Sequence, residues 1–234
     1  MSAQSAQIPQ GAQEYLECIF EMEEEGAIIL QARLSERLGV TPATVSQAVR
    51  KLLNEGLIEI DGRKIHLTQT GIDVATPLVR RHRLAERLLT DILGVPWYRA
   101  HEEAHDWEHV ISTEVEQKIL EKTGATTCPH GNPIPGTTPP YERSKLIPLT
   151  EMRPEDEGVL SLLNEDVELV TDILKYFQDQ GLMPGATVKV SSVGPDGTMT
   201  LSVNGKSASL GPSLADNLWM LPVTSAGSGE ERAS

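Results

Sequence analysis

The sequence predicts a mainly α protein with small β elements, arranged as an N-terminal winged helix-turn-helix, a helical block and a C-terminal β-barrel. Three observations predict this order. Two short amphipathic segments flank a tight turn and precede a hairpin pattern, a block rich in His and Glu follows, and the last third alternates apolar and polar residues between Gly and Pro turns. A chain of 234 residues is long enough for all three parts.

Two helices are expected to meet at a tight turn near residue 40. Leucines at every fourth position from Leu30 to Leu38 form one helical face, and Gly39 supplies a helix stop. Thr41 followed by Pro42 supplies an N-cap with proline at the first helical position. The spacing therefore predicts a helix-turn-helix.

The second helix of this pair separates an apolar face from a polar one. The residues expected to face inward are Val45, Val49, Leu52 and Leu53. Glutamine can pair with a base edge, hydroxyls with phosphates, and small apolar groups with a thymine methyl. The predicted DNA contacts are Gln31, Thr41, Ala43, Thr44, Ser46, Gln47, Lys51 and Arg63.

A β-hairpin is expected directly after this helix. Apolar residues alternate from Ile58 to Ile60, Asp61-Gly62 marks a turn, and the alternation resumes from Ile65 to Leu67. Arg63 and Lys64 then lie near the tip. Helix, turn, helix and basic hairpin describe a winged helix that binds DNA, and a winged helix used for protein contacts is the alternative.

The charge distribution favours DNA over the alternative. The net charge is −14, yet the stretch from Arg33 to Arg87 holds ten basic against six acidic residues. A basic block inside an acidic protein is the electrostatic footprint of a nucleic-acid surface, although a solvated helix surface also remains open.

The helical block carries metal-ligand chemistry. His82 and Glu86 are four residues apart on one expected helix. On the next helix, four donors share one face at 100° per residue: His101, His105, Glu108 and His109. Imidazole and carboxylate groups at these spacings converge on a divalent cation. The alternative interpretation is a histidine-rich helix that is exposed to solvent and binds no metal.

Two other functions compete with a metal-controlled regulator. The string "HEEAH" fits a zinc protease that uses His101 and His105 as ligands and Glu102 as general base. Against it, Glu108 and His109 fill the coordination sphere from the same helix, where a protease keeps a water. A regulator controlled by an organic ligand needs an aromatic-lined pocket, and the chain has only nine aromatic residues.

Five motifs resemble one family of regulators. "EYLECIFEMEEEG", "TVSQAV", "RRHRLAERLLTDILG", "HEEAHDWEHVISTEVE" and "GNPIPG" are similar to the iron-dependent (diphtheria toxin) repressors and the manganese transport regulators, over residues 13 to about 222. The resemblance implies a metal-bound homodimer that represses transcription on DNA, with a primary and an ancillary metal site. It implies no enzyme activity.

By position, the resemblance assigns two sets of ligands. The primary site takes Glu14, His105, Glu108 and His109, and the ancillary site takes His82, Glu86 and His101. Iron-sensing members have methionine and cysteine where this chain has Glu14 and His105. Replacing sulfur by oxygen and nitrogen donors favours Mn²⁺ and leaves Fe²⁺ open.

Further ligands come from two other segments. Cys128 and His130 lie two apart in a loop similar to one that contributes to the second site in streptococcal members. A short helix from Glu168 to Phe177 is expected next, where Asp172 or Glu168 could ligate. A buried cysteine beside a surface histidine is the alternative for the loop.

The C-terminal part is expected to be an SH3-like (FeoA-type) barrel, with strands at 188–190 and 199–203. The predicted domains are 1–75 for DNA binding, 76–140 for dimerisation and metal binding, 141–222 for the linker and barrel, and 223–234 for a disordered tail.

The predicted partners are a palindromic DNA operator and a second copy of the chain, with Mn²⁺ or Fe²⁺ at two sites per subunit. A cytoplasmic location is expected, because the sequence has no signal peptide and no apolar run that could span a membrane.

Overall fold

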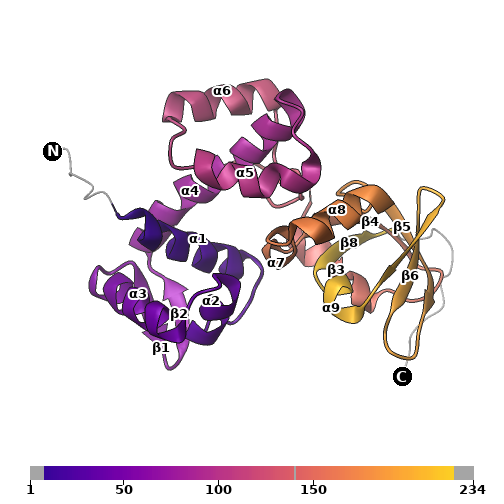
Figure 1. Cartoon of the computed structure of the whole chain (residues 1–234), viewed down its shortest axis with the longest axis horizontal. Coiled ribbons are helices and arrows are strands. Elements are labelled where there is room, and N and C mark those ends of the chain that lie inside the picture. The colour runs from indigo at the N-terminus through magenta and orange to yellow at the C-terminus, as the bar shows by residue number, and fades with distance from the viewer. Residues whose placement is uncertain (1–7, 140, 224–234) are drawn as a thin grey trace. The chain divides into compact units, whose positions relative to one another are not determined.

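The structure, a computed structural model, describes residues 8–139 and 141–223 (Figure 1). The chain forms two compact units. The described part of unit 1 comprises 8–95, 100–128 and 133–138, and that of unit 2 comprises 96–99, 129–132, 139 and 141–223. Unit 1 therefore contains both the helix-turn-helix and the helical block.

Unit 1 is mainly helical. Its elements are α1 (Gln10–Glu24), α2 (Gln31–Arg37), α3 (Pro42–Asn54), β1 (Ile58–Asp61), β2 (Lys64–Leu67), α4 (Gln69–Arg87), a π-helical turn (Leu88–Ile92), α5 (Ala100–Trp107) and α6 (Thr113–Thr123).

The predicted helix-turn-helix is confirmed as α2 and α3. Gly39 has a positive φ of 63° between them, and the Thr41 hydroxyl accepts a hydrogen bond from the Thr44 amide at 3.2 Å. Val45, Val49 and Leu52 are buried, whereas Leu53 is 41% exposed. The inward prediction for Leu53 is wrong, because eight residues after Val45 it has rotated to the edge of the apolar face.

The wing is an antiparallel hairpin whose turn lies one residue later than predicted. Asp61 pairs with Lys64, so Gly62 and Arg63 form the two-residue turn, and Gly62 alone takes a positive φ of 61°. Ile65 is buried, while its partner Ile60 is 39% exposed. On β2, apolar residues are therefore buried as the alternation predicts, whereas Ile60 near the tip of β1 is exposed.

Helix α5 is shorter than the sequence suggested. A single helix over residues 101–109 was expected, but α5 ends at Trp107. The Glu108 amide still donates to Ala104 O at 3.1 Å, so Glu108 stays on the last turn, and His109 lies beyond it. The chain turns here and buries Ile111 in the helical core.

Unit 2 is built on a six-stranded antiparallel sheet of order β3-β8-β4-β5-β6-β7. Its strands and α-helices are β3 (Ile147–Pro148), β4 (Glu157–Leu163), α7 (Glu165–Glu168), α8 (Thr171–Gln180), β5 (Thr187–Val193), β6 (Met199–Val203), β7 (Lys206–Leu210), α9 (Pro212–Ala215) and β8 (Leu218–Pro222). Three 3₁₀ turns also belong to it, at Trp97–Arg99, Arg143–Lys145 and Leu149–Glu151.

The two strands expected at 188–190 and 199–203 are confirmed as β5 and β6. The helix expected from Glu168 to Phe177 is confirmed from Thr171 onward as part of α8, but its start is wrong, because the chain breaks at Leu169 and Val170 between α7 and α8.

The predicted tail, residues 223–234, lies outside the described residues except for Val223, which is exposed. In the ranges that are described, no helix is both long and apolar enough to cross a membrane.

The first turn of α4 packs against the carbonyl of Leu57, and Gly71 permits this approach. A Cβ on Gly71 would lie 2.0 Å from Leu57 O. We expect Gly71→Ala to lower the free energy of unfolding by roughly 2 to 3 kcal/mol, because neither backbone can give way cheaply. Urea denaturation measures the change. The matched control is Gly11→Ala in α1, where an added Cβ meets nothing within 4 Å. An equal loss in both variants would contradict the steric explanation.

Candidate metal centre

Helix α4 places two polar side chains in the interior of unit 1. His82 and Glu86 are one turn apart, and both are buried beside the apolar residues Leu84 and Ala85. Charged and titratable groups are rarely buried unless something pairs with them. Their partners come from α5 and the turn that follows it.

The first group of donors consists of His82, Glu86 and His101. His82 Nε2 lies 3.1 Å from His101 Nδ1 and 3.6 Å from Glu86 Oε1, and His101 Nδ1 lies 3.3 Å from the same oxygen. Neighbouring ligands around a divalent ion with bonds of about 2.1 Å are themselves about 3 Å apart. The three donor atoms therefore have the spacing of one face of a coordination sphere.

The second group consists of His105, Glu108 and His109. Glu108 Oε1 lies 3.7 Å from His105 Nδ1 and 3.2 Å from His109 Nε2. Glu108 is fully buried, and among the described residues neither its Oε1 nor either ring nitrogen of His109 has a hydrogen-bond partner. Buried polar atoms without partners are costly, so a cation would satisfy Glu108 and His109. Among the described residues, the donor atoms that lie within 4.8 Å of one another here are those of His82, His105 and Glu108, and His109 does not join them.

One hydrogen bond joins the two groups. His82 Nδ1 and Glu108 Oε2 are 2.6 Å apart, so the two nitrogens of His82 face different groups. No local sequence pattern indicates this contact, because 26 positions separate the two residues. A carboxylate on the far nitrogen of a metal-binding histidine fixes the ring orientation and raises its basicity.

These contacts shift the pKa values of both partners. Burial opposes charge on His82, but its hydrogen bonds to Glu108 and Glu86 and their negative charges raise its pKa well above the usual value. Burial likewise opposes charge on Glu108, while its bond to His82 and the charges of His82, His105 and His109 lower its pKa overall. These contacts therefore favour the protonated form of His82 in the metal-free protein.

Glu14 is not part of either group. It lies half-buried on α1, and the residue beside it, Gln13, shares a cavity of about 370 Å³ with His109. The first turn of α1 is thus near the second group, although the structure does not bring the Glu14 carboxylate into it. Ligation by Glu14 remains a prediction from the resemblance.

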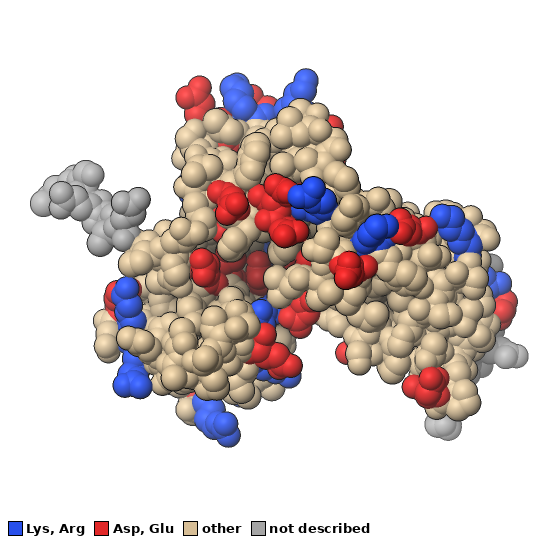
Figure 2. Space-filling view, in the orientation of Figure 1, with Lys and Arg blue, Asp and Glu red and all other residues tan. Residues whose placement is uncertain are grey.

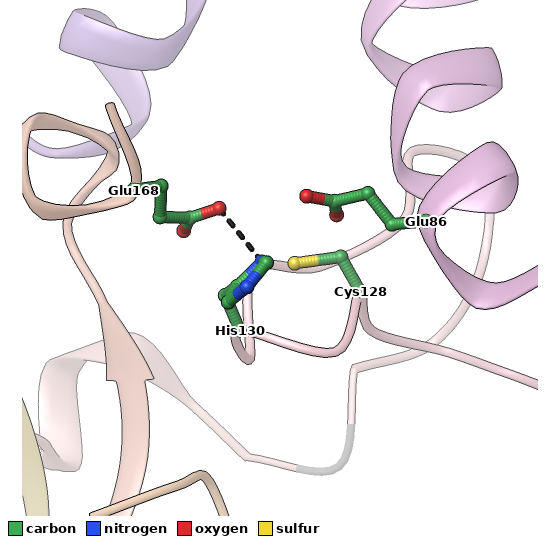
Figure 3. A group of neighbouring side chains, drawn as sticks. All are labelled: Glu86, Cys128, His130 and Glu168. Atoms are coloured by element: carbon green, nitrogen blue, oxygen red, sulfur yellow. Dashed lines mark ion pairs between the residues drawn. The ribbon is translucent and has the colours of Figure 1, made fainter. Parts of the chain in front are cut away.

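The predicted loop ligands lie in different units, and each has buried partners. In unit 1, Cys128 Sγ is within 4.8 Å of a Glu86 carboxylate oxygen. In unit 2, the buried His130 ring has Nδ1 2.9 Å from Glu168 Oε2 (Figure 3). Asp172 is exposed on α8, because the break after α7 separates it from Glu168. It joins no donor group of the described residues.

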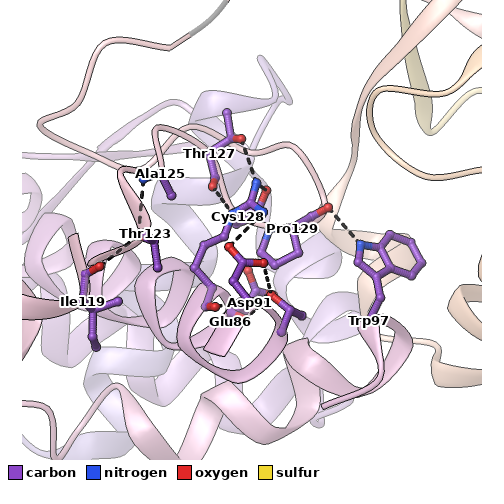
Figure 4. A network of polar contacts seen from close by, with 11 residues as sticks. Glu86, Asp91, Trp97, Ile119, Thr123, Ala125, Thr127, Cys128 and Pro129 are labelled. Atoms are coloured by element: carbon purple, nitrogen blue, oxygen red, sulfur yellow. Dashed lines mark hydrogen bonds and ion pairs between the residues drawn. The ribbon is translucent and has the colours of Figure 1, made fainter. Parts of the chain in front are cut away.

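Three arginines of α4 hold the loop that contains Cys128. Arg80 donates to Pro135 O at 2.5 Å, Arg83 to Pro133 O at 2.6 Å, and Arg87 to the carbonyls of Thr127 and Cys128 at 2.7 and 3.0 Å. Figure 4 shows the loop near Cys128. It also shows the indole of Trp97, which donates a hydrogen bond to Pro129 O at 2.9 Å. In the sequence alone, these arginines were counted only as part of the basic stretch from Arg33 to Arg87.

The candidate DNA surface lies on the outer face of α3 and on the wing. All eight predicted DNA contacts are exposed except Ser46, which is partly exposed and accepts a hydrogen bond from Arg50. An open depression of about 600 Å³ is lined by Ala43, Gln47, Arg50, Lys51, Asn54 and Glu55. Figure 2 shows Lys and Arg side chains projecting over α3 and the hairpin. Asn54 and Glu55 were not predicted.

Three family descriptions match successive parts of the chain. Residues 8–65 match the N-terminal DNA-binding domain of iron-dependent repressors, and 68–136 match their metal-binding and dimerisation domain. Residues 147–221 match the FeoA domain.

Individual proteins show the same likeness. Over 202 residues the chain is 39% identical to the iron-dependent repressor IdeR of Mycobacterium tuberculosis, covering 82% of this chain and 87% of that protein. It is 37% identical over 214 residues to the diphtheria toxin repressor of Corynebacterium diphtheriae, covering 87% and 93%. A solved manganese-dependent transcriptional repressor in complex with manganese aligns with a TM-score of 0.80 at 30% identity, covering 91% of this chain and all of that one.

The helix-turn-helix, the buried donor groups and these matches define a metal-dependent DNA-binding repressor with a dimerisation domain. The chain belongs to the iron-dependent repressor family. It is a transcriptional regulator and not an enzyme, so the protease alternative for "HEEAH" is rejected.

Metal binding near neutral pH is expected to release a proton from His82. Its raised pKa keeps the ring protonated in the metal-free protein, whereas a metal ligand is a neutral imidazole. For the folded metal-free protein, the stabilising charge on His82 is present at low pH and is lost as pH rises through this raised pKa. Proton release should therefore decline over the same range.

Calorimetric titration of Mn²⁺ into metal-free protein, in buffers with different ionisation heats across a pH series, counts these protons. His66→Gln is the control, because His66 lies half-exposed on the wing away from both donor groups. Heats that do not depend on the buffer at neutral pH would contradict the assignment.

Proposed function

We propose that the protein is a repressor activated by Mn²⁺ or Fe²⁺, which binds a palindromic operator as a homodimer and holds two metal ions per subunit. The observation that carries the proposal is the pair of donor groups joined through His82 and Glu108, within the same compact unit as the helix-turn-helix. His82, Glu86 and His101 would hold one ion. His105, Glu108 and His109 would hold the other, with Glu14 as a further predicted ligand.

Contact with the operator is assigned to α3 and the wing. Gln47 and Ala43 line the outer depression and are placed to read base edges, while Lys51 and Arg63 would bind phosphates. The remaining proposed contacts are Gln31, Thr41, Thr44 and Ser46. Two copies of α3 in a dimer would occupy successive major grooves about 34 Å apart.

A dimer surface is supported by apolar residues that unit 1 leaves in solvent. Ile92 is 45% exposed, Leu93 55%, Val110 78% and Val115 45%. In the sequence, Ile92 and Leu93 follow the buried Leu89, and Val110 directly precedes the buried Ile111. An apolar surface that is left in solvent by one subunit can be covered by a second copy of the chain.

The chain's own charges explain why activity would depend on metal. Glu86 and Glu108 are both buried and flank His82, so the metal-free centre holds two buried carboxylates close to one buried imidazole ring. A divalent cation would supply the positive charge that lets these carboxylates and the neutral imidazoles remain together. The donors would then hold α4, α5 and the turn at Glu108 in one arrangement.

The choice of metal follows from the donor types. Each group offers two imidazoles and one carboxylate, and the sulfur near them is the Cys128 thiol, whose Sγ lies within 4.8 Å of a Glu86 carboxylate oxygen. Nitrogen and oxygen donors suit Mn²⁺ and Fe²⁺ and lack the thiolate that favours softer ions. The relatives include both an iron-dependent and a manganese-dependent repressor, in agreement with this pair of candidates.

The direct test is a mobility shift of operator DNA with metal and with chelator. Mn²⁺ or Fe²⁺ should raise affinity for DNA about 30- to 150-fold, the range of a coupling of roughly 2 to 3 kcal/mol. The variant Gln47→Ala should lose discrimination between operator and unrelated DNA. Binding that is equally strong with chelator would refute metal control.

The metal preference is tested by restoring sulfur donors. Glu14→Met combined with His105→Cys should shift the preference from Mn²⁺ towards Fe²⁺ by at least about tenfold, because a softer donor set favours the later metal. Competitive metal titration of wild type and double variant measures the ratio. His66→Cys introduces a thiol outside the centre and is the control. An unchanged Mn/Fe ratio in the double variant would show that donor hardness does not set the preference.

A further inference from the structure

Three consecutive glutamates end helix α1. Glu23 and Glu24 form its last residues, and Glu25 is its C-cap. The C-terminus of a helix carries partial negative charge, so carboxylates are locally unfavourable there, and the last turn of α1 contains no basic residue. Neighbouring residues on a helix point about 100° apart. The three carboxylates are therefore unfavourable at this end of the helix, and their side chains point in three different directions.

Glu23 reaches the wing. Its Oε1 accepts a hydrogen bond from the Leu67 amide at 3.1 Å and lies 3.5 Å from His66 Nδ1. Both residues belong to β2, the strand that follows the basic turn at Arg63. The carboxylate of Glu23 thus fixes the wing to the end of α1.

Glu24 reaches the helix that holds the metal donors. Its Oε2 accepts from Arg83 Nη2 at 2.7 Å, and the Arg83 side chain is buried. Arg83 directly follows His82 and also donates to Pro133 O. Movement of α4 at His82 would therefore act on α1 through this ion pair.

Glu25 reaches the helix-turn-helix. Its Oε2 accepts from Arg37 Nη2 at 2.7 Å, and both side chains are less than 10% exposed. Arg37 is the last residue of α2, immediately before the turn that leads to α3. A charge-assisted bond with so little exposure constrains the end of α2 tightly.

We propose that Glu23, Glu24 and Glu25 are positioning residues that transmit the metal-dependent placement of α4 to the wing and to the helix-turn-helix. The inference rests on the proposed function. Its route runs from His82 and Arg83 through Glu24 to the end of α1, and from there to β2 and α2. It does not pass through Glu14, so it is a second connection between metal and DNA surfaces.

A positioning role and a purely stabilising role predict different effects on DNA affinity. A residue that only stabilises the fold changes DNA affinity equally with and without metal. A positioning residue changes the ratio of the two affinities, and by linkage it changes by the same factor the effect of DNA on metal affinity. This ratio is the readout, because spatial continuity alone does not establish coupling.

The experiment measures DNA affinity of the full-length protein by fluorescence anisotropy, with saturating Mn²⁺ and with chelator, and metal affinity without DNA by calorimetry. For Glu24→Gln we expect the metal-induced enhancement to fall at least about fivefold, the lower end of typical coupling energies. Metal affinity without DNA should stay within about twofold, since Glu24 is not a donor in either group. Glu24→Asp should restore part of the enhancement.

Glu36→Gln is the matched control. Glu36 is an exposed residue of α2, so its substitution removes the same charge near the DNA surface outside the triplet. It should change both affinities equally and leave the enhancement intact. Should Glu24→Gln fail to fold in a thermal scan, Glu23→Ala replaces it, because it removes the acceptor of the Leu67 amide at the wing.

The outcomes separate the two hypotheses. If wild type shows no metal enhancement, the proposed function fails. If wild type shows it and the triplet variants keep the same ratio as Glu36→Gln, the function stands and the transmission role is overturned. A selective loss of the ratio in the triplet variants supports that role.

Discussion

The arrangement of unit 1 depends on one buried imidazole. His82 lies in the interior of α4 with Glu108 on one ring nitrogen and Glu86 and His101 near the other. Burying this ring beside two carboxylates is unfavourable unless charge and hydrogen bonds are matched, so the residues around it cannot vary independently. The same ring belongs to one donor group and orients the carboxylate of the other, which ties the two groups into one centre.

Helix α4 also carries arginines that make hydrogen bonds and ion pairs outside that centre. Arg80, Arg83 and Arg87 direct their guanidinium groups to loop carbonyls, and Arg83 adds the ion pair with Glu24. Arginine suits this task because its planar fork makes several directed hydrogen bonds and remains charged when buried. A basic stretch that resembled a nucleic-acid footprint therefore serves two purposes. The residues of α3 and the wing point to solvent, whereas those of α4 hold the interior together.

Much of the fold could be predicted from local patterns. The N-cap at Thr41, the stop at Gly39 and the spacing of Val45, Val49 and Leu52 depend on residues only a few positions apart. The errors had two sources. Leu53 continued an apolar spacing, but the helical rotation placed it at the edge of the apolar face. Helix α5 stopped at Trp107, and the chain beyond it buries Ile111 in the helical core.

By itself, the sequence determined the helix-turn-helix, the wing, strands β5 and β6 of the C-terminal unit and the histidines and glutamates of the two donor groups. Side-chain periodicity and capping are local properties, and these groups recur at helical spacing. Only the tertiary structure decided that Glu108 bonds His82, that Glu24 pairs with Arg83, and that Asp172 turns away from Glu168. These outcomes join or separate side chains through the packing of whole helices, and no spacing along the chain encodes the distance between two helices.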